Sequence, residues 1–521
     1  MLSPSIKLLL QGYRDYLSKT NSQEMTDVIH VDEVAAKIAK FYERIRNIID
    51  YRESHLLREN TILRILKRSL ILYRDNGKIA EFLIKEIIRS GHLPNDVIPE
   101  TKIGAVGKLI SQLVYLLGKS RGNRELSEWL TRISAAAIEE ILDPPVKDRL
   151  LAETMFAALK GRLIMSGQEI DENAKATQLY VGIERALLRV DDDQLAYRLL
   201  KLIYPAWDNL TDAELDEIGG KIVLIKRTVD SYMKHPLGKH FLAFSKRYST
   251  VFLLLGDIVF KQKMIPESLT SFFENQENVD MAAADAYKKR LAQQKKSLRR
   301  IAFLSVLSLF ITKVLIAFAL EIPIDIYLNQ YVLENAVFNT LFPPLLLFVI
   351  IMFIRPPGRG NLTLIKKELE AVVLEASAKD YVLNIPKPKK SLIKDLVILI
   401  YIAVSIAVLY GTVKLLLHFN FSPASIGVFV LFTSIVAATG IRVNNRSKEL
   451  NMKEKKSSFW GLVFDTVFMP FVSLGQFIIA GLSKLQFLVT LINLIDVPFQ
   501  MFVIFIEHFN QFIRSKREEV Q

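Results

Sequence analysis

The feature that most constrains this chain is a series of long apolar stretches in its C-terminal half. The first, Ile301–Leu320, reads IAFLSVLSLFITKVLIAFAL and contains one charged residue, Lys313. About 20 apolar residues in an α-helix cross the ~30 Å hydrocarbon core of a bilayer. A polytopic α-helical transmembrane domain is therefore expected over residues 301–513, before a short charged tail at 514–521. Its predicted spans are residues 301–320, 336–354, 396–417, 424–441, 459–482 and 487–509.

The preceding 300 residues are charged, and their apolar positions recur every three or four residues, as in Val34, Ile38, Phe41 and Ile45. This spacing is typical of amphipathic helices. Asp143-Pro144-Pro145 ends one of them, and the next is predicted over 146–165. We found no alternating run that predicts a strand. The fold class is therefore all-α, with a soluble multi-helix domain at 1–281, either a bundle or an irregular solenoid, preceding the membrane domain.

The basic residues favour a membrane surface as a partner. The chain has 68 Lys and Arg against 55 Asp and Glu, a net charge of +13. Such a balance suits nucleic acid or anionic lipid, and because much of the excess flanks apolar stretches, no nucleic-acid partner is expected. The juxtamembrane helix predicted at 282–300 is either a solvated cytoplasmic anchor or an anionic-lipid contact. Its basic residues are Lys288, Lys289, Arg290, Lys295, Lys296, Arg299 and Arg300.

The loops between the predicted spans alternate in charge. Lys and Arg in short loops prefer the cytoplasmic side. Residues 321–334 contain none, 355–395 contain nine and 442–458 contain six. Both termini are therefore expected in the cytoplasm, in the plasma (inner) membrane of a bacterium or in an organelle membrane. Residues 361–378 are predicted to form an amphipathic helix that packs on the N-terminal domain or lies along the membrane, followed by an extended tether at 385–390.

Polar residues inside the spans give a candidate intramembrane site. Met469-Pro470-Phe471 and Val497-Pro498-Phe499 repeat one pattern, each preceded by an Asp. The last two spans are either kinked helices or an interfacial or re-entrant hairpin, or they face a polar cavity whose acids bind a cation or relay protons. Lys313 is expected to reach the outer face or to pair with Asp465 or Asp496. The candidate polar residues are Lys313, Asp465, Gln476, Asp496 and Gln500. The candidate kinks are Pro343, Pro344, Pro470 and Pro498.

The sequence contains little catalytic chemistry. It has no cysteine, which excludes disulfides, thiolate nucleophiles and Cys-ligated zinc. Asp191-Asp192-Asp193 is interpreted as the N-terminal cap of a helix rather than a metal site. No cleaved signal, cofactor or metal is expected, and the chain is predicted not to be an enzyme. The leading hypothesis is a membrane-anchored scaffold that binds an unknown protein partner. The alternatives are an ion or small-solute transporter or channel, and a membrane enzyme of unknown type.

Overall fold

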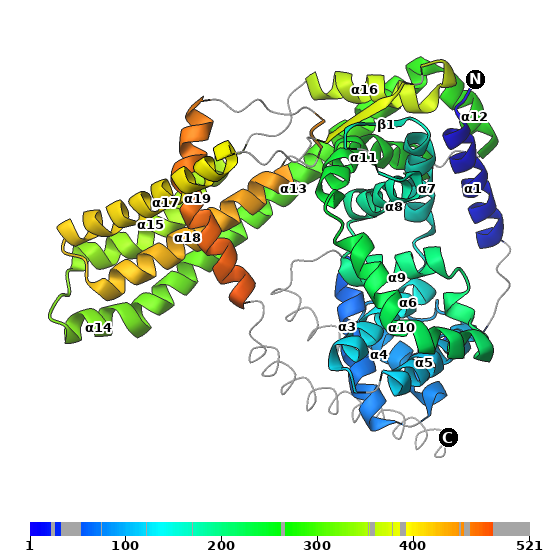
Figure 1. The fold of residues 1–521 in the computed structure, drawn as a ribbon, viewed down its shortest axis with the longest axis horizontal. Coiled ribbons are helices and arrows are strands. Elements are labelled where there is room, and N and C mark those ends of the chain that lie inside the picture. The colour runs from blue at the N-terminus through cyan, green and yellow to red at the C-terminus, as the bar shows by residue number, and fades with distance from the viewer. Residues whose placement is uncertain are drawn as a thin grey trace, which may run out of the picture.

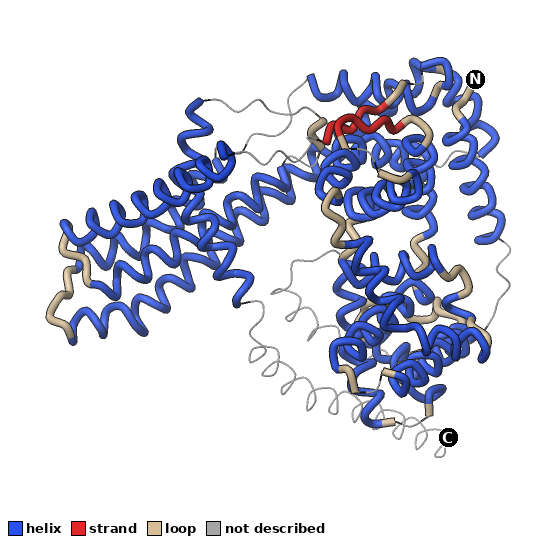
Figure 2. Tube along the Cα trace, viewed as in Figure 1, coloured by secondary structure: helices blue, strands red, loops and turns tan. Residues whose placement is uncertain are grey.

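The computed structural model shows a chain that is almost entirely helical, as predicted (Figures 1 and 2). Two short strands are the exception. The residues that the structure describes are 1–21, 27–32, 54–73, 75–120, 122–168, 170–261, 266–352, 354, 360–377, 379–385, 392–447, 450–452 and 459–482.

A first core lies among helices drawn from the early and middle parts of the chain. These are α3 (Ser54–Leu72), α4 (Asn76–Arg89), α5 (Thr101–Lys119), α6 (Arg124–Leu142), α9 (Asp192–Ile203) and α10 (Asp212–Met233). Each buries an apolar stripe of helical spacing, such as Ile79, Leu83 and Ile87 of α4. α10 begins with a capping box, in which the backbone N–H of Thr211 donates to Glu214 at 2.8 Å.

A second core gathers the remaining N-terminal helices and includes segments from much later in the chain. Its helices are α1 (Pro4–Asn21), α7 (Val146–Lys160), α8 (Glu172–Ile183), α11 (Gly238–Lys261), α12 (Pro266–Glu274), the start of α13 (Gln276–Ile316) and α16 (Gly360–Val373). A 3-10 turn, η4 (Glu375–Ser377), follows α16. Short turns also connect the N-terminal helices, namely the π-helical turn η1 (Glu184–Leu188) and the 3-10 turn η2 (Trp207–Asn209).

The two strands correct the prediction that the chain has none. β1 (Leu163–Gly167) pairs in parallel with β2 (Tyr381–Ile385), with Leu163 opposite Tyr381. The helix predicted over 146–165 therefore ends at Lys160, five residues early. Along β2 the side chains alternate between buried and exposed, as expected for a strand on a core. Each strand is short, and its partner is more than two hundred residues away, so neither shows a hairpin signal in the sequence.

The apolar helices form a separate bundle beside the N-terminal helices (Figure 1). It contains the later part of α13, the π-helical turn η3 (Ala317–Glu321), α14 (Ile322–Tyr327), α15 (Leu333–Met352), α17 (Leu392–His418), α18 (Pro423–Ser447) and α19 (Phe459–Leu482). We call this group the membrane bundle.

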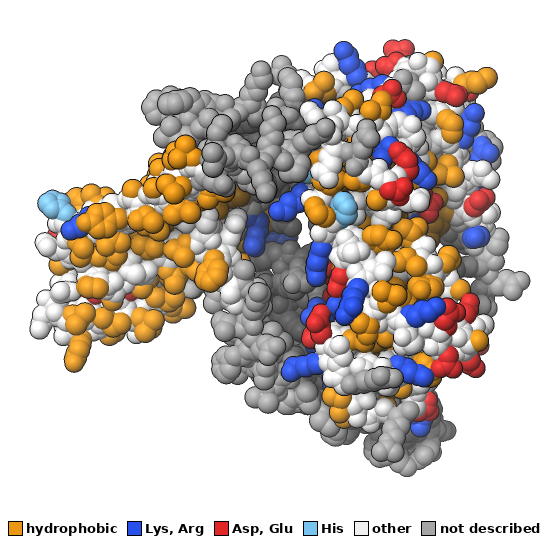
Figure 3. All heavy atoms as spheres, in the orientation of Figure 1, with side chains coloured by type: hydrophobic (Ala, Val, Ile, Leu, Met, Phe, Trp, Pro, Cys, Tyr) orange, Lys and Arg blue, Asp and Glu red, His pale blue; other side chains and the backbone are white. Residues whose placement is uncertain are grey.

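Four helical segments of the described chain are long and apolar enough to cross a membrane. They are Gln276–Tyr327, Leu333–Met352, Ile398–His418 and Pro423–Asn444. In α19 a shorter apolar stretch, Thr466–Ile479, was found. The span predicted at 487–509 lies outside the described residues. The visible surface of the bundle is largely hydrophobic, whereas charged side chains gather on the N-terminal helices (Figure 3). Exposed apolar side chains such as Phe318 (71%) and Leu399 (65%) fit a lipid environment.

Three connections join the bundle to the second core. α13 is one continuous helix of 41 residues, about 60 Å long, that begins in the second core and ends in the bundle. α16 and β2 come from between α15 and α17, and they bury Ile365, Leu369 and Tyr381 in this core. Of the two positions considered for the amphipathic helix at 361–378, the structure has the one packed on the N-terminal helices.

The third connection is residues 450–452, which follow α18. Leu450 and Met452 are buried in the second core. The Asn361 side chain donates to the carbonyl of Leu450 at 2.6 Å and accepts from the N–H of Met452 at 2.8 Å. It also lies 3.2 Å from the Tyr287 hydroxyl of α13. One buried amide therefore connects all three segments. We use the name helical unit for the described parts of residues 1–287 together with 360–385 and 450–452.

A substitution at Gly167 can test the pairing of β1 with β2. Its φ is +101°, and an added Cβ would lie 2.0 Å from the carbonyl oxygen of Ile385. Gly167→Ala should therefore separate the end of β1 from β2 and destabilise the protein by about 1–3 kcal/mol. Thermal unfolding and amide hydrogen exchange in β1 and β2 measure the effect. Gly161→Ala is the control, because a Cβ added at that position would have no atom within 4 Å. Equal stability of the two variants would contradict the pairing.

Candidate functional site

A buried polar cluster lies within the membrane bundle, centred on Lys313. The side chain of Lys313 is fully buried, and its Nζ bonds to the carboxylate of Glu321 in η3, which is also buried. Lys313 was expected to reach the outer face or to pair with Asp465 or Asp496, and Glu321 was counted with residues 321–334, between two predicted spans. The correct partner is only eight residues away, because the helix continues past residue 320 to Tyr327. The π-helical turn η3 lies directly before Pro323, so the α-helical hydrogen bonding changes there while the chain stays helical to Tyr327.

Two other helices complete this cluster. Asn339 of α15 donates to Glu321 at 2.8 Å and to the carbonyl of Ser425 at 3.1 Å. The face of the Phe432 ring lies 5.0 Å from Lys313 Nζ. In hydrocarbon an unpaired charge costs several kcal/mol, so a paired Lys and Glu with polar neighbours is the arrangement that lets both remain buried. The cluster therefore fastens α13, α15 and α18 together.

A second carboxylate lies one turn further on. Asp325 of α14 is buried, and it accepts hydrogen bonds from the hydroxyls of Ser422 and Ser425 at the start of α18. Asn335 donates to the carbonyls of Phe419 and Asn420 at 3.0 and 3.1 Å. These contacts hold the end of α14 and the start of α15 against the turn between α17 and α18.

Of the other predicted membrane residues, those that the structure describes lie outside this cluster. Gln476 is exposed on α19, and Pro470 lies buried within the same helix. Pro343 and Pro344 are buried inside α15. The side chain of Asp465 is outside the described part of the structure. So are Asp496, Pro498 and Gln500 in full. A site made of these acids stays a prediction.

The juxtamembrane basic residues lie on α13 and divide into two groups. Arg290 is half-buried, and its guanidinium bonds to the buried carboxylate of Asp257 and to the carbonyl of Leu253. It therefore holds α13 against α11, which removes it from the predicted lipid contact. The remaining members are exposed and stay candidates for that contact: Lys288, Lys289, Lys295, Lys296, Arg299 and Arg300.

A network of buried charges, which sequence reasoning missed, lies where the two cores meet. Arg198 of α9 is 6% exposed and bonds to Glu140 of α6 at 2.8 Å. It also bonds to Glu184 of η1. The neighbours Ile183 and Leu187 are buried in the second core, so Arg198 links the two cores; we call this place the joint. Arg149 of α7 bonds to the other oxygen of Glu140. The sequence signal was the presence of acidic residues within the apolar stripe of α6, directly before the Asp143-Pro144-Pro145 break.

Cavities lie on both sides of this network. The larger, about 610 Å³, lies between α7, α8 and α9. Its lining includes the aromatic rings of Phe156 and Tyr180, the exposed Leu202, and the basic Lys160 and Lys201. The second cavity, about 370 Å³, is lined by Arg58, Glu139, Gln194 and Arg198 among others. Here Arg58 pairs with Glu139 at 2.6 Å, and burial raises the pKa of that carboxyl.

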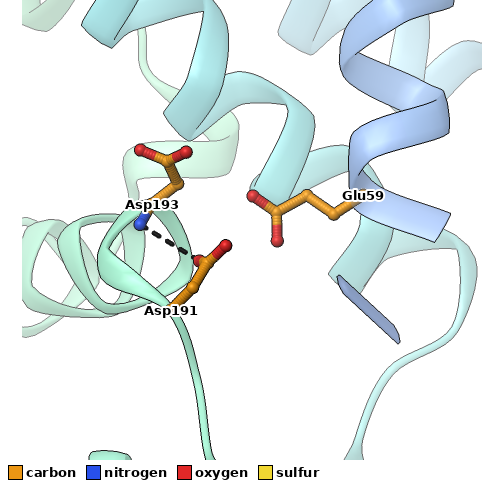
Figure 4. A group of neighbouring side chains, drawn as sticks. All are labelled: Glu59, Asp191 and Asp193. Atoms are coloured by element: carbon orange, nitrogen blue, oxygen red, sulfur yellow. Dashed lines mark hydrogen bonds between the residues drawn. The ribbon is translucent and has the colours of Figure 1, made fainter. Parts of the chain in front are cut away.

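The three consecutive aspartates begin α9, as predicted. Asp191 caps the helix, and its Oδ1 accepts from the N–H groups of Asp193 and Gln194 at 3.1 and 3.0 Å. The structure adds that Glu59 of α3 faces Asp191 and Asp193 (Figure 4).

Comparisons with protein-family models, curated proteins and solved structures found no match to this chain. Its function therefore has to be inferred from its own residues.

A double-mutant cycle tests the ion pair in the bundle. Lys313→Met or Glu321→Gln alone should cost about 3–5 kcal/mol, because each leaves the partner buried without its counter-charge. The double variant should cost less than either single variant. Unfolding of the detergent-solubilised protein by denaturant measures these differences. Lys414→Met is the control, because Lys414 is exposed on α17 and should change stability by less than about 0.5 kcal/mol. Additive costs would show that the two side chains do not interact.

Proposed function

We propose that this protein is an integral membrane scaffold, whose helical unit is held in the cytoplasm in a fixed orientation to bind a partner protein. The observation that carries the proposal is the shared second core. Segments from between α15 and α17 and from after α18 are buried in the same core as the N-terminal helices. A module attached by one flexible linker could rotate freely, whereas three connections restrict its movement.

The same contacts support the proposed orientation in the membrane. A buried core cannot be divided by a bilayer, so the N-terminus, residues 360–385 and residues 450–452 must share one side. The segments between the spans that carry the Lys and Arg residues are the ones that include these parts. The Lys-free and Arg-free turns after α14 and between α17 and α18 lie at the far end of the bundle (Figure 1). Charge and packing therefore favour the same topology, with the helical unit cytoplasmic.

The cavity between α7, α8 and α9 is the surface that best suits a partner. Leu202 is 54% exposed beside the half-buried rings of Phe156 and Tyr180, which pack edge to face at 6.3 Å. Lys160 and Lys201 lie at its margin. Apolar anchors in a pocket with a charged rim are the features that dominate protein interfaces. We therefore expect the partner to present an apolar side chain flanked by acidic residues. A transporter function remains an alternative prediction, because the acids that it would use lie outside the described residues.

The absence of native cysteine makes the topology directly testable. Glu334→Cys places a single thiol at an exposed position at the start of α15 in the bundle, and Lys367→Cys places one at an exposed position on α16 of the helical unit. In intact cells a membrane-impermeant maleimide should label Glu334→Cys alone, and permeabilisation should add Lys367→Cys. Labelling is read by a mass shift on a gel. Reaction of both positions in intact cells would contradict the proposed topology.

Partner binding can be tested in the same cells. A photo-crosslinking amino acid at position 202 should capture a specific protein, and the same amino acid at position 224 should not. Leu224 is also an exposed leucine, 63% accessible, but it lies on α10 away from the cavity. Once the captured protein is identified, Lys160→Glu should weaken its binding about tenfold or more, equivalent to about 1.4 kcal/mol. Capture that is equal at the two positions, or absent at both, would contradict the scaffold.

A further inference from the structure

Three carboxylates from two distant parts of the chain converge where α3 meets the start of α9. Glu59 comes from α3, Asp191 from the residue before α9, and Asp193 from its first turn. One oxygen from each can be chosen so that all lie within 4.8 Å of one another. Figure 4 shows the Glu59 carboxylate directed toward both aspartates. Like charges at this separation repel each other, so the arrangement requires something that neutralises them.

The neighbouring side chains leave this need unmet. Glu59 is 4% exposed, and its Oε2 has no hydrogen-bond partner among the described residues. Gln194, which is not an acidic residue, is a second side chain with a buried polar atom that lacks a hydrogen-bond partner. It is 3% exposed, its amide hydrogen-bonds to Glu59, and its Oε1 likewise lacks a partner in the described structure. A buried polar atom without a partner costs about 1–3 kcal/mol. Two neighbouring side chains, Glu59 and Gln194, therefore each carry one such atom.

Without a bound cation, the surroundings of Glu59 favour its protonated form. Burial, followed by the charges of Asp191, Asp193 and Glu139, raises the pKa of Glu59 to about 9. Arg132 contacts Asp193 at 3.2 Å and offsets one negative charge. With all three carboxylates ionised, a net charge of about −2 remains.

We propose that Glu59, Asp191 and Asp193 form a binding site for a divalent cation, with Gln194 supplying a neutral oxygen. Carboxylate and amide oxygens are hard ligands of the kind that Ca²⁺ and Mg²⁺ prefer. Oxygens on opposite sides of Ca²⁺ are about 4.6–5.2 Å apart, whereas those around Mg²⁺ are at most about 4.2 Å apart. Oxygens that all lie within 4.8 Å of one another can share one Ca²⁺ ion, and Ca²⁺ tolerates irregular oxygen geometry more readily than Mg²⁺, which demands a near-ideal octahedron.

An ion can reach this position from solvent, because the side chains of Asp191 and Asp193 are partly exposed. Gln194 also lines the cavity of about 370 Å³ at the joint between the two cores, together with Val190. A bound ion would connect α3 of the first core to the segment that leads from η1 into α9. The site is independent of the proposed partner-binding cavity, which lies on the other side of the Arg198 network.

The test is the thermal unfolding of the full-length protein in detergent, after metal removal and then with added CaCl₂ or MgCl₂. Ca²⁺ should raise the Tm and Mg²⁺ should raise it less, and calorimetric titration should show one Ca²⁺ bound per chain. Glu59→Gln and Asp191→Asn should each abolish the Ca²⁺ response. Gln at position 59 removes a buried charge at constant size, and Asn at position 191 retains the capping oxygen, so both variants are expected to fold.

Asp75→Asn provides the matched control. Asp75 caps α4 with the same geometry, accepting from the N–H groups of Gly77 and Lys78, but it lies outside the cluster. This variant should keep the full Ca²⁺ response. Two results would overturn the proposal: a wild-type Tm that does not change with Ca²⁺, or a rise of equal size in Glu59→Gln. The first would leave a proton to neutralise Glu59, and the second would show that Ca²⁺ binds elsewhere on the protein.

Discussion

Burial of apolar side chains in the second core is the interaction on which the rest of the structure depends. β2 and α16 arrive from the membrane bundle, and they contribute Tyr381, Ile385 and Ile365 to a core otherwise built from N-terminal helices. Without these residues the core would lose one of its faces, and α11 would expose its apolar stripe to water. The bundle likewise depends on the core, because α13 belongs to both. The two parts of the chain are therefore mutually dependent, although their compositions differ sharply.

Charges inside this protein follow one rule in water-facing and lipid-facing parts alike. A buried charge carries a large desolvation cost, so it persists only with a partner at hydrogen-bond distance. Lys313 has Glu321 in the bundle, and Arg198 has Glu140 and Glu184 at the joint. At Glu59 the neighbouring charges that shift the pKa are acidic, and burial together with these charges raises it to about 9. Either a proton or the proposed cation therefore has to neutralise this carboxyl.

Local patterns in the sequence were enough to predict most helices. They could not predict which distant segments pair with each other. The mainly helical class, the spans of α15, α17 and α18, and the cap at Asp191 each depend on residues within one or two turns. β1 and β2 could not be predicted in this way, because each strand pairs with a segment from the other half of the chain. Glu321 was misassigned for a related reason: an acid at the edge of an apolar stretch resembles a loop residue until its buried lysine is placed.

The carboxylate cluster, the buried charge network and the partner cavity all lie near the joint between the two cores. α9 carries Asp191 and Gln194 at its start, Arg198 in its middle and Leu202 near its end. It therefore contacts the carboxylate cluster, the buried charge network and the partner cavity in succession along about 18 Å of helix. Because Arg198 is fastened to Glu140 and Glu184 on both sides of the joint, α9 cannot shift at one end without straining these bonds. The fold thus places all three features on one helix, whose middle is bonded to both cores through Arg198.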